Sequence, residues 1–164
     1  RTERIFAFLN KNSAQTSSNF QLRQSLIALG SGHIFGVGLG NSLQKYSYLP
    51  EANTDFIFSI IGEELGLVGT IFIVILFFMF AFFGIRIALK AKDYLGRLIA
   101  MGITSMIVIQ AIMNMFISVG LIPVTGMTLP FISYGGSSLA TNMISVGILL
   151  NISKYRIIST CEEE

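Results

Sequence analysis

Two long, predominantly apolar stretches of the sequence carry no charged residue, and they define the predicted architecture. The first, residues 65–85, consists of 21 residues that are mostly Leu, Ile, Val and Phe. As a helix it would be about 31 Å long, which is enough to cross the hydrocarbon core of a bilayer. The second runs from residue 98 to residue 153 and is too long for one helix. Pro123, Gly126 and Pro130 interrupt it, so we predict two further spans, 98–122 and 131–152.

The sequence before the first span is more polar and is predicted to form a large loop, residues 1–64. Within this loop, residues 20–29 place most of their apolar side chains on one side of a helix. This helix is too short and too polar to span a membrane, so an interfacial or re-entrant helix is expected. Residues 30–41 are rich in glycine, which suits a tight loop lying close to other backbone or to a ligand.

The composition agrees with an all-α integral membrane protein. Hydrophobic residues make up 52% of the chain and charged residues only 12%, with a mean hydropathy of +0.70, whereas soluble domains carry about 25% charged residues. The single cysteine, Cys161, cannot form an internal disulfide. A net charge of +2 does not indicate a nucleic-acid partner. The chain opens without an initiating Met or a signal peptide, so we expect it to be the C-terminal part of a longer protein.

Basic residues predict the orientation of the spans. The 122–130 turn carries no Lys or Arg, whereas the 86–97 loop and the end of the third span do. By the positive-inside rule, these basic ends belong in the cytoplasm. Residues 1–64 and the 122–130 turn are then extracytoplasmic, and residues 157–164 form a cytoplasmic tail. The basic residues concerned are Arg86, Lys90, Lys92, Arg97, Lys154 and Arg156.

Four carboxylates lie just before the first span, where acidic side chains are costly and call for a functional reason. Asp55 has two interpretations. It can cap the N-terminus of a helix together with Thr54. It can also lead a stripe of small residues that lines a cavity or a close helix contact, and then act as a general base. At about 100° per residue, that stripe consists of Ser59, Gly62, Gly66 and Gly69.

The other three carboxylates are less specific. Glu64 lies opposite Asp55 on the same ideal helix and is expected to serve another purpose. Glu63 and Glu64 are either solvated at the interface or paired with hidden partners. Glu51, in the turn after Pro50, is of interest because it lies four residues before Asp55. His33, the only histidine, is interpreted as a loop residue. The sequence shows no metal cluster, nucleophile elbow or Walker loop, which argues against proteases and ATPases.

Polar residues also lie within the second and third spans. Gln110, Asn114 and Ser118 recur at every fourth position, and we favour hydrogen bonding between helices as their role. The third span opens with SYGGSS, residues 133–138. Its Ser133, Gly135 and Gly136 can either bring backbone N–H groups to an anionic ligand or permit close packing.

Residues 24–69 and 120–139 resemble the SEDS family (FtsW, RodA and SpoVE) of peptidoglycan glycosyltransferases. The resemblance covers about residues 20–156. NSLQK before YLPE, and PVTG before LPFISYGG, are closest to the FtsW/SpoVE branch. Members of the family have ten membrane helices, so the resemblance implies that this chain is the last three spans with the large extracytoplasmic loop before them. It also implies a bacterial cell-membrane location.

The resemblance further implies an activity and the residues that carry it. The reaction is the polymerisation of lipid II into glycan, in cell division or sporulation, with release of undecaprenyl pyrophosphate. Asp55 matches the proposed catalytic aspartate of the family's TDF motif. Glu51 of LPE and Lys45 of NSLQK match positions linked to activity, and we include them with Ser133, Gly135 and Gly136 as substrate-binding candidates.

Several points of this implied function stay open at the level of the sequence. The sequence implies no certain cofactor, and a divalent metal bridging Asp55 or Glu51 to pyrophosphate is an open alternative. The expected partners are membrane lipid and a class B penicillin-binding protein. The motif departs from the common LPEAHTDF at Asn53, and Thr125 stands where some FtsW lineages have a Lys. Two other functions are alternatives: a lipid II flippase, and a non-catalytic scaffold for a penicillin-binding protein.

Overall fold

The structure, a computed structural model, describes residues 17–38, 40 and 55–161. Every regular element in these ranges is an α-helix, in agreement with the predicted all-α class. Of the predicted site residues, Lys45 and Glu51 lie outside the described ranges. The helices of the described ranges are α2 (Ser17–Ser31), α4 (Ile57–Lys90), α5 (Tyr94–Ser118) and α6 (Gly136–Cys161).

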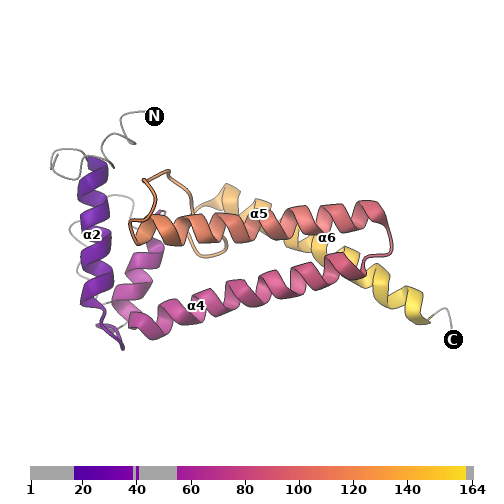
Figure 1. Cartoon of the computed structure of the whole chain (residues 1–164), viewed down its shortest axis with the longest axis horizontal. Helices are drawn as coiled ribbons and strands as arrows, with labels where there is room; N and C mark the ends of the chain where they lie inside the picture. The colour runs from indigo at the N-terminus through magenta and orange to yellow at the C-terminus, as the bar shows by residue number, and fades with distance from the viewer. Residues whose placement is uncertain (1–16, 39, 41–54, 162–164) are drawn as a thin grey trace.

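Helix α4 is broken near its start, and this break shapes the molecule. Gly66 has a φ of 67° and a ψ of −160°, outside the helical region. The break separates a short arm, residues 57–65, from a long arm, residues 67–90. In Figure 1 the short arm stands beside α2, and the long arm turns away from it to run along α5. The predicted span 65–85 therefore lies within a longer helix that already begins at Ile57.

Residues 33–38 close the break by pairing with the helix backbone on both of its sides. The N–H groups of Val37 and Gly38 donate to the carbonyls of Glu63 and Glu64 at 3.0 and 3.1 Å. In the other direction, the N–H groups of Leu67 and Val68 donate to the carbonyls of His33 and Ile34 at 3.1 and 3.3 Å. A helix break inside a membrane needs such replacement partners, because lipid supplies none. We call residues 33–38 and 63–68 together the joint.

Glycines permit the close approach of backbones at the joint. A Cβ on Gly36 would collide with the Glu64 carbonyl, and one on Gly66 would collide with the backbone of Gly36 and Ile34. Gly32 is equally close to the Gly62 carbonyl. The prediction that the glycine-rich segment forms a tight loop against other backbone is confirmed.

Helix α5 packs against the long arm of α4 and ends earlier than its predicted span. Gly84 lies so close to the Thr104 side chain that an added Cβ would collide with it. The helix ends at Ser118 because Gly120, with a φ of 79°, closes a Schellman motif. In this motif the N–H of Leu121 donates to the Phe116 carbonyl at 2.9 Å. Residues 119–122, predicted as helix, are therefore part of the following loop.

Helix α6 begins at Gly136, so the predicted start of the third span at residue 131 is wrong for the helix. Residues 131–135 instead form a turn. Phe131 has a left-handed φ of 66°, which cannot continue a helix. The Ser133 N–H donates to the Leu129 carbonyl at 3.0 Å, and its Oγ accepts from the Leu129 N–H at 2.7 Å.

Two of the three predicted spans have the length and apolarity needed to cross a membrane. Among the described residues these are helices α4 and α5, and the predicted third span, now in α6, is not among them. The reason is the run of hydroxyl and amide side chains along the first half of α6. Phe72 and Phe78 on α4 are 61% and 73% exposed, as expected for side chains surrounded by lipid or by further helices.

Candidate functional site

Asp55 lies immediately before the short arm of α4 and is held against the loop that follows α5. The Asn114 Nδ2 donates to the backbone carbonyl of Asp55 at 2.9 Å and to that of Met127 at 2.6 Å. A Cβ added to Gly126 would lie 3.6 Å from the Asp55 Oδ2. Helix α5 therefore brings the TDF and PVTG motifs together, with the half-buried Asp55 carboxylate at their meeting point.

Asp55 does not occupy the N-cap position of α4. The N-cap residue is Phe56, whose side chain makes no cap hydrogen bond. Phe56 is 1% exposed and packs with Ile60 and Ile117, which anchors the start of the helix in a small apolar cluster. The Asp55 backbone is thus fixed by its buried neighbour and by Asn114.

The loop between α5 and α6 folds back along α5. The Gln110 Nε2 donates to the Thr128 carbonyl at 3.0 Å, eight residues before the end of the helix. Eight residues correspond to about 12 Å of helix, so the loop returns well down the length of α5. The polar residues of α5 form hydrogen bonds as predicted, but the partners of Gln110 and Asn114 are loop backbone and not a neighbouring helix.

Hydrogen bonds among three buried serines connect α2, α4 and α5. Ser25, Ser59 and Ser118 are all fully buried. The Ser25 Oγ donates to the Ser118 carbonyl at 2.7 Å and lies 2.6 Å from the Ser59 Oγ. Because Ser25 has one hydroxyl proton, Ser59 must donate in the second bond. Ser59, the first residue of the predicted stripe, is buried where it contacts α2. Sequence reasoning missed Ser25, which the sequence does not distinguish from the other serines of α2.

The motif residues Ser133, Gly135 and Gly136 line one pocket. It has a volume of about 450 Å³ and is also lined by Ile57, two residues after Asp55. A Cβ added to Gly136 would meet no heavy atom within 4 Å in the described part of the chain. Within that part, Gly136 therefore opens the pocket and does not serve close packing. We call this the glycine pocket.

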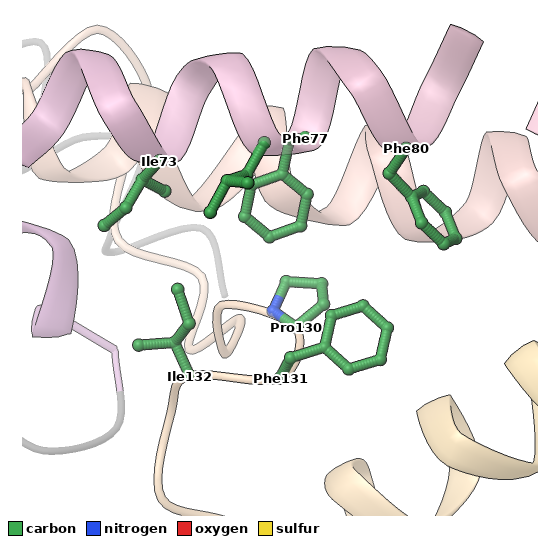
Figure 2. Close-up of a pocket in the computed structure, with 7 residues that line it drawn as sticks. Ile73, Phe77, Phe80, Pro130, Phe131 and Ile132 are labelled. Carbon is green, nitrogen blue, oxygen red and sulfur yellow. The ribbon is translucent and has the colours of Figure 1, made fainter. Parts of the chain in front are cut away.

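A second, apolar pocket of about 220 Å³ adjoins the glycine pocket and shares Phe131 and Ile132 with it. Figure 2 shows Ile73, Phe77 and Phe80 of α4 pointing toward the loop residues Pro130, Phe131 and Ile132. The rings of Phe80 and Phe131 lie 6.2 Å apart between centroids, tilted by 59°. The left-handed backbone of Phe131 thus lies at the wall between a partly polar pocket and an almost wholly apolar one.

The acidic residues further along α4 are set apart from Asp55. Glu63 is only 3% exposed, and Glu64 has a buried Oε1 with no hydrogen-bond partner among the described residues. The backbone carbonyls of both residues belong to the joint. Of the two alternatives for these glutamates, burial therefore excludes solvation for Glu63. His33, as predicted, is a loop residue, and it has a left-handed φ of 45°.

No three His, Cys, Asp or Glu side chains lie together in the part of the chain that the structure describes. Glu51, the second carboxylate suggested for a metal, falls outside that part. A divalent metal bound by Asp55 or Glu51 therefore stays a prediction.

Comparison with known proteins gives consistent matches. The model of the FtsW/RodA/SpoVE family, described as a cell cycle protein, matches residues 1–157. The chain is 54% identical over 155 residues to stage V sporulation protein E of Bacillus subtilis, covering 94% of this chain and 42% of that protein. It is 52% identical to the probable peptidoglycan glycosyltransferase FtsW of Geobacter metallireducens, covering 93% of this chain and 41% of the relative.

A solved structure agrees with this result. The fold matches a chain from work on the structural coordination of polymerization and crosslinking by a peptidoglycan synthase complex. The TM-score is 0.74 and the identity 27%, over 94% of this chain and 41% of that one. The chain thus spans about two fifths of the length of the relatives that it matches. It belongs to the FtsW/RodA/SpoVE family of cell cycle proteins.

Proposed function

We propose that this chain supplies the catalytic carboxylate and part of the substrate site of a lipid II polymerase that acts in cell division or sporulation. The observation that carries the proposal is the place of Asp55. Its carboxylate lies next to Gly126 of the PVTG motif, and its backbone carbonyl accepts a hydrogen bond from Asn114. Ile57, two residues further along the chain, lines the glycine pocket. The relatives named as peptidoglycan glycosyltransferases support the same assignment.

The proposed reaction joins two lipid-linked substrates. The Asp55 carboxylate accepts the proton of the 4-hydroxyl on the incoming GlcNAc, and the hydroxyl oxygen attacks the anomeric carbon of the growing strand. The bond from that carbon to the pyrophosphate breaks with inversion, and undecaprenyl pyrophosphate leaves. The glycine pocket offers the hydroxyl of Ser133 and the backbone around Gly135 and Gly136 to substrate oxygens. Lys45 and Glu51 are proposed to act on the same substrate.

The proposed setting follows the predicted orientation. Asp55 and the glycine pocket then face the extracytoplasmic side, where lipid-linked sugars are polymerised, and the chain ends in the cytoplasm. A class B penicillin-binding protein is the proposed partner, because the matching structure is a chain of a peptidoglycan synthase complex.

The test is Asp55→Ala in the full-length protein, assayed for glycan strands made from purified lipid II. Loss of a general base typically costs about 10² to 10⁴ in rate. The matched control is Asp93→Ala, because Asp93 is an exposed carboxylate before α5 whose side chain makes no cap hydrogen bond. Undiminished polymerisation by the Asp55 variant would refute the catalytic role. Lipid II movement across vesicles without polymerisation would favour the flippase alternative.

A further inference from the structure

The bend of α4 is fixed by a backbone geometry that is almost exclusive to glycine. Gly66 combines a φ of 67° with a ψ of −160°, a region that residues with a side chain essentially do not occupy. Four backbone hydrogen bonds to residues 33–38, two on each side of the break, hold this geometry at 3.0–3.3 Å. The joint therefore sets one angle between the two arms of α4 and leaves little freedom to flex.

The short arm converts that angle into the position of Asp55. Its nine residues give it a length of about 13 Å, and Asp55 lies just beyond its far end. A change of about 10° at the joint would then move that end by about 2 Å. In enzymes, a misplacement of about 1 Å at a reacting group can cost about 10²-fold in rate.

Two further contacts, with α2 and α5, also fix the position of the short arm. The Ser59 side chain hydrogen bonds to Ser25 of α2, and the Asp55 carbonyl accepts from Asn114 of α5. Ser25 and Asn114 are both fully buried. Hydrogen bonds weaken steeply when their distance or angle changes, so these two contacts tolerate little displacement of the short arm. Only one arm angle satisfies the joint, the Ser25 contact and the Asn114 contact together.

We propose that Gly66 and Gly36 are positioning residues for Asp55, acting through the joint and the short arm of α4. The inference rests on the proposed catalytic role of Asp55. Both glycines lie more than ten residues from Asp55 in the sequence, and the proposal gives them a specific effect on turnover. They do not contact the substrate in this proposal.

Gly66→Ala in the full-length protein tests the proposal. Alanine favours a continuous helix, and its Cβ would collide with the backbone of Gly36 and Ile34. We expect kcat for lipid II polymerisation to fall about 10²-fold, with KM close to the wild-type value. Gly102→Ala is the control, because a Cβ there meets no heavy atom within 4 Å among the described residues. It should keep wild-type kcat.

A double-mutant cycle separates positioning from general damage. If Gly66 acts through Asp55, the double variant with Asp55→Ala should be as slow as Asp55→Ala alone. A further drop would overturn the proposal, as would a wild-type kcat in Gly66→Ala. If Asp55→Ala itself polymerises normally, the proposed function fails instead, so the two failures are distinguishable.

Two further measurements keep the proposal testable if Gly66→Ala does not fold. Gly36→Ala disrupts the same joint from the loop side, since its Cβ would collide with the Glu64 carbonyl, and it should reproduce the loss of kcat. In the wild-type protein, the amides of Leu67 and Val68 should be strongly protected from hydrogen exchange by the bonds to His33 and Ile34. Exchange as fast as that of exposed amides would overturn the proposal without any variant.

Discussion

Two regions of the molecule are stabilised in different ways. The hydrogen-bonded region comprises α2, residues 55–65 and residues 110–135, where side chains bond across elements: Ser25 to Ser118, Asn114 to Asp55 and Gln110 to Thr128. The apolar region comprises residues 67–90 of α4 with residues 94–109 of α5. There the hydroxyls of Thr70, Thr104 and Ser105 bond within their own helices.

The two kinds of contact fix atomic positions to different degrees. Apolar packing has little directional preference, so it can hold two helices together without fixing any one atom. Hydrogen bonds weaken steeply with angle and distance, so they fix positions. The candidate catalytic carboxylate lies in the region that is built from directional contacts. The following substitutions challenge this contrast, from the largest expected effect to the smallest.

Asn114→Leu should have the largest effect. It leaves the carbonyls of Asp55 and Met127 without their donor in partly buried surroundings, at a cost of about 1–3 kcal/mol of stability. Because it also releases the Asp55 backbone, polymerisation should fall at least about tenfold. The measurements are glycan synthesis and thermal unfolding in detergent.

Asn142→Leu is the matched control, because the buried Nδ2 of Asn142 has no partner in the described ranges. It should cost clearly less stability than Asn114→Leu. Equal losses in the two variants would contradict the claim that the cross-element bonds are what fixes this region.

Gly84→Val should come second and should affect stability more than turnover. Its side chain would collide with Thr104 and push α4 and α5 apart in the apolar region, for about 1–3 kcal/mol. Thr104→Ala in the same protein should restore part of the lost unfolding temperature. If the folded Gly84→Val protein instead loses most of its kcat, the two regions are not separable.

Gln110→Leu should have a smaller effect of the same kind as Asn114→Leu. It removes donation to the carbonyl and hydroxyl of Thr128, at about 1 kcal/mol. The affected loop leads to the glycine pocket, so KM for lipid II should rise by a few fold while kcat stays near wild type. An unchanged KM would show that the loop is held without Gln110.

The smallest effect should come from Ser105→Ala, because its hydroxyl is exposed and bonds to the Gly102 carbonyl of its own helix. The change in unfolding free energy should stay within about 0.5 kcal/mol. Ser25→Ala makes the same chemical change in the hydrogen-bonded region and should cost about 1 kcal/mol or more. Similar values for the two serines would weaken the contrast between the regions.

Sequence patterns predicted the features that depend on local chemistry. The charge-free run 65–85 does lie in helix α4, Gln110 and Asn114 do form hydrogen bonds, and the glycine-rich segment does approach other backbone. The resemblance pointed to the family that the comparisons show. These predictions succeeded because each depends on a local property of the sequence: the length of an apolar run, the hydrogen-bonding groups of an amide side chain or the glycine content of a segment.

The features that were missed depend on distant partners. The stripe led by Asp55 was derived on a continuous ideal helix, but the pairing of residues 33–38 breaks that helix at Gly66. The sequence alone does not distinguish a helical glycine in an apolar run from a non-helical one. The late start of α6 likewise depends on the left-handed backbone of Phe131. The presence of an aromatic residue in the sequence does not indicate this conformation.

The hydrogen bond from Ser25 to Ser118 has a consequence for synthesis of the protein. Its two residues are 93 positions apart, so the contact cannot form until most of the chain has left the ribosome and α5 has entered the membrane. The position of Asp55 is therefore completed late in biogenesis, after the helix that carries Asn114 has arrived. Ser25→Cys in ribosome-bound chains should stay open to thiol reagents until residue 118 is inserted, and early protection would contradict this order.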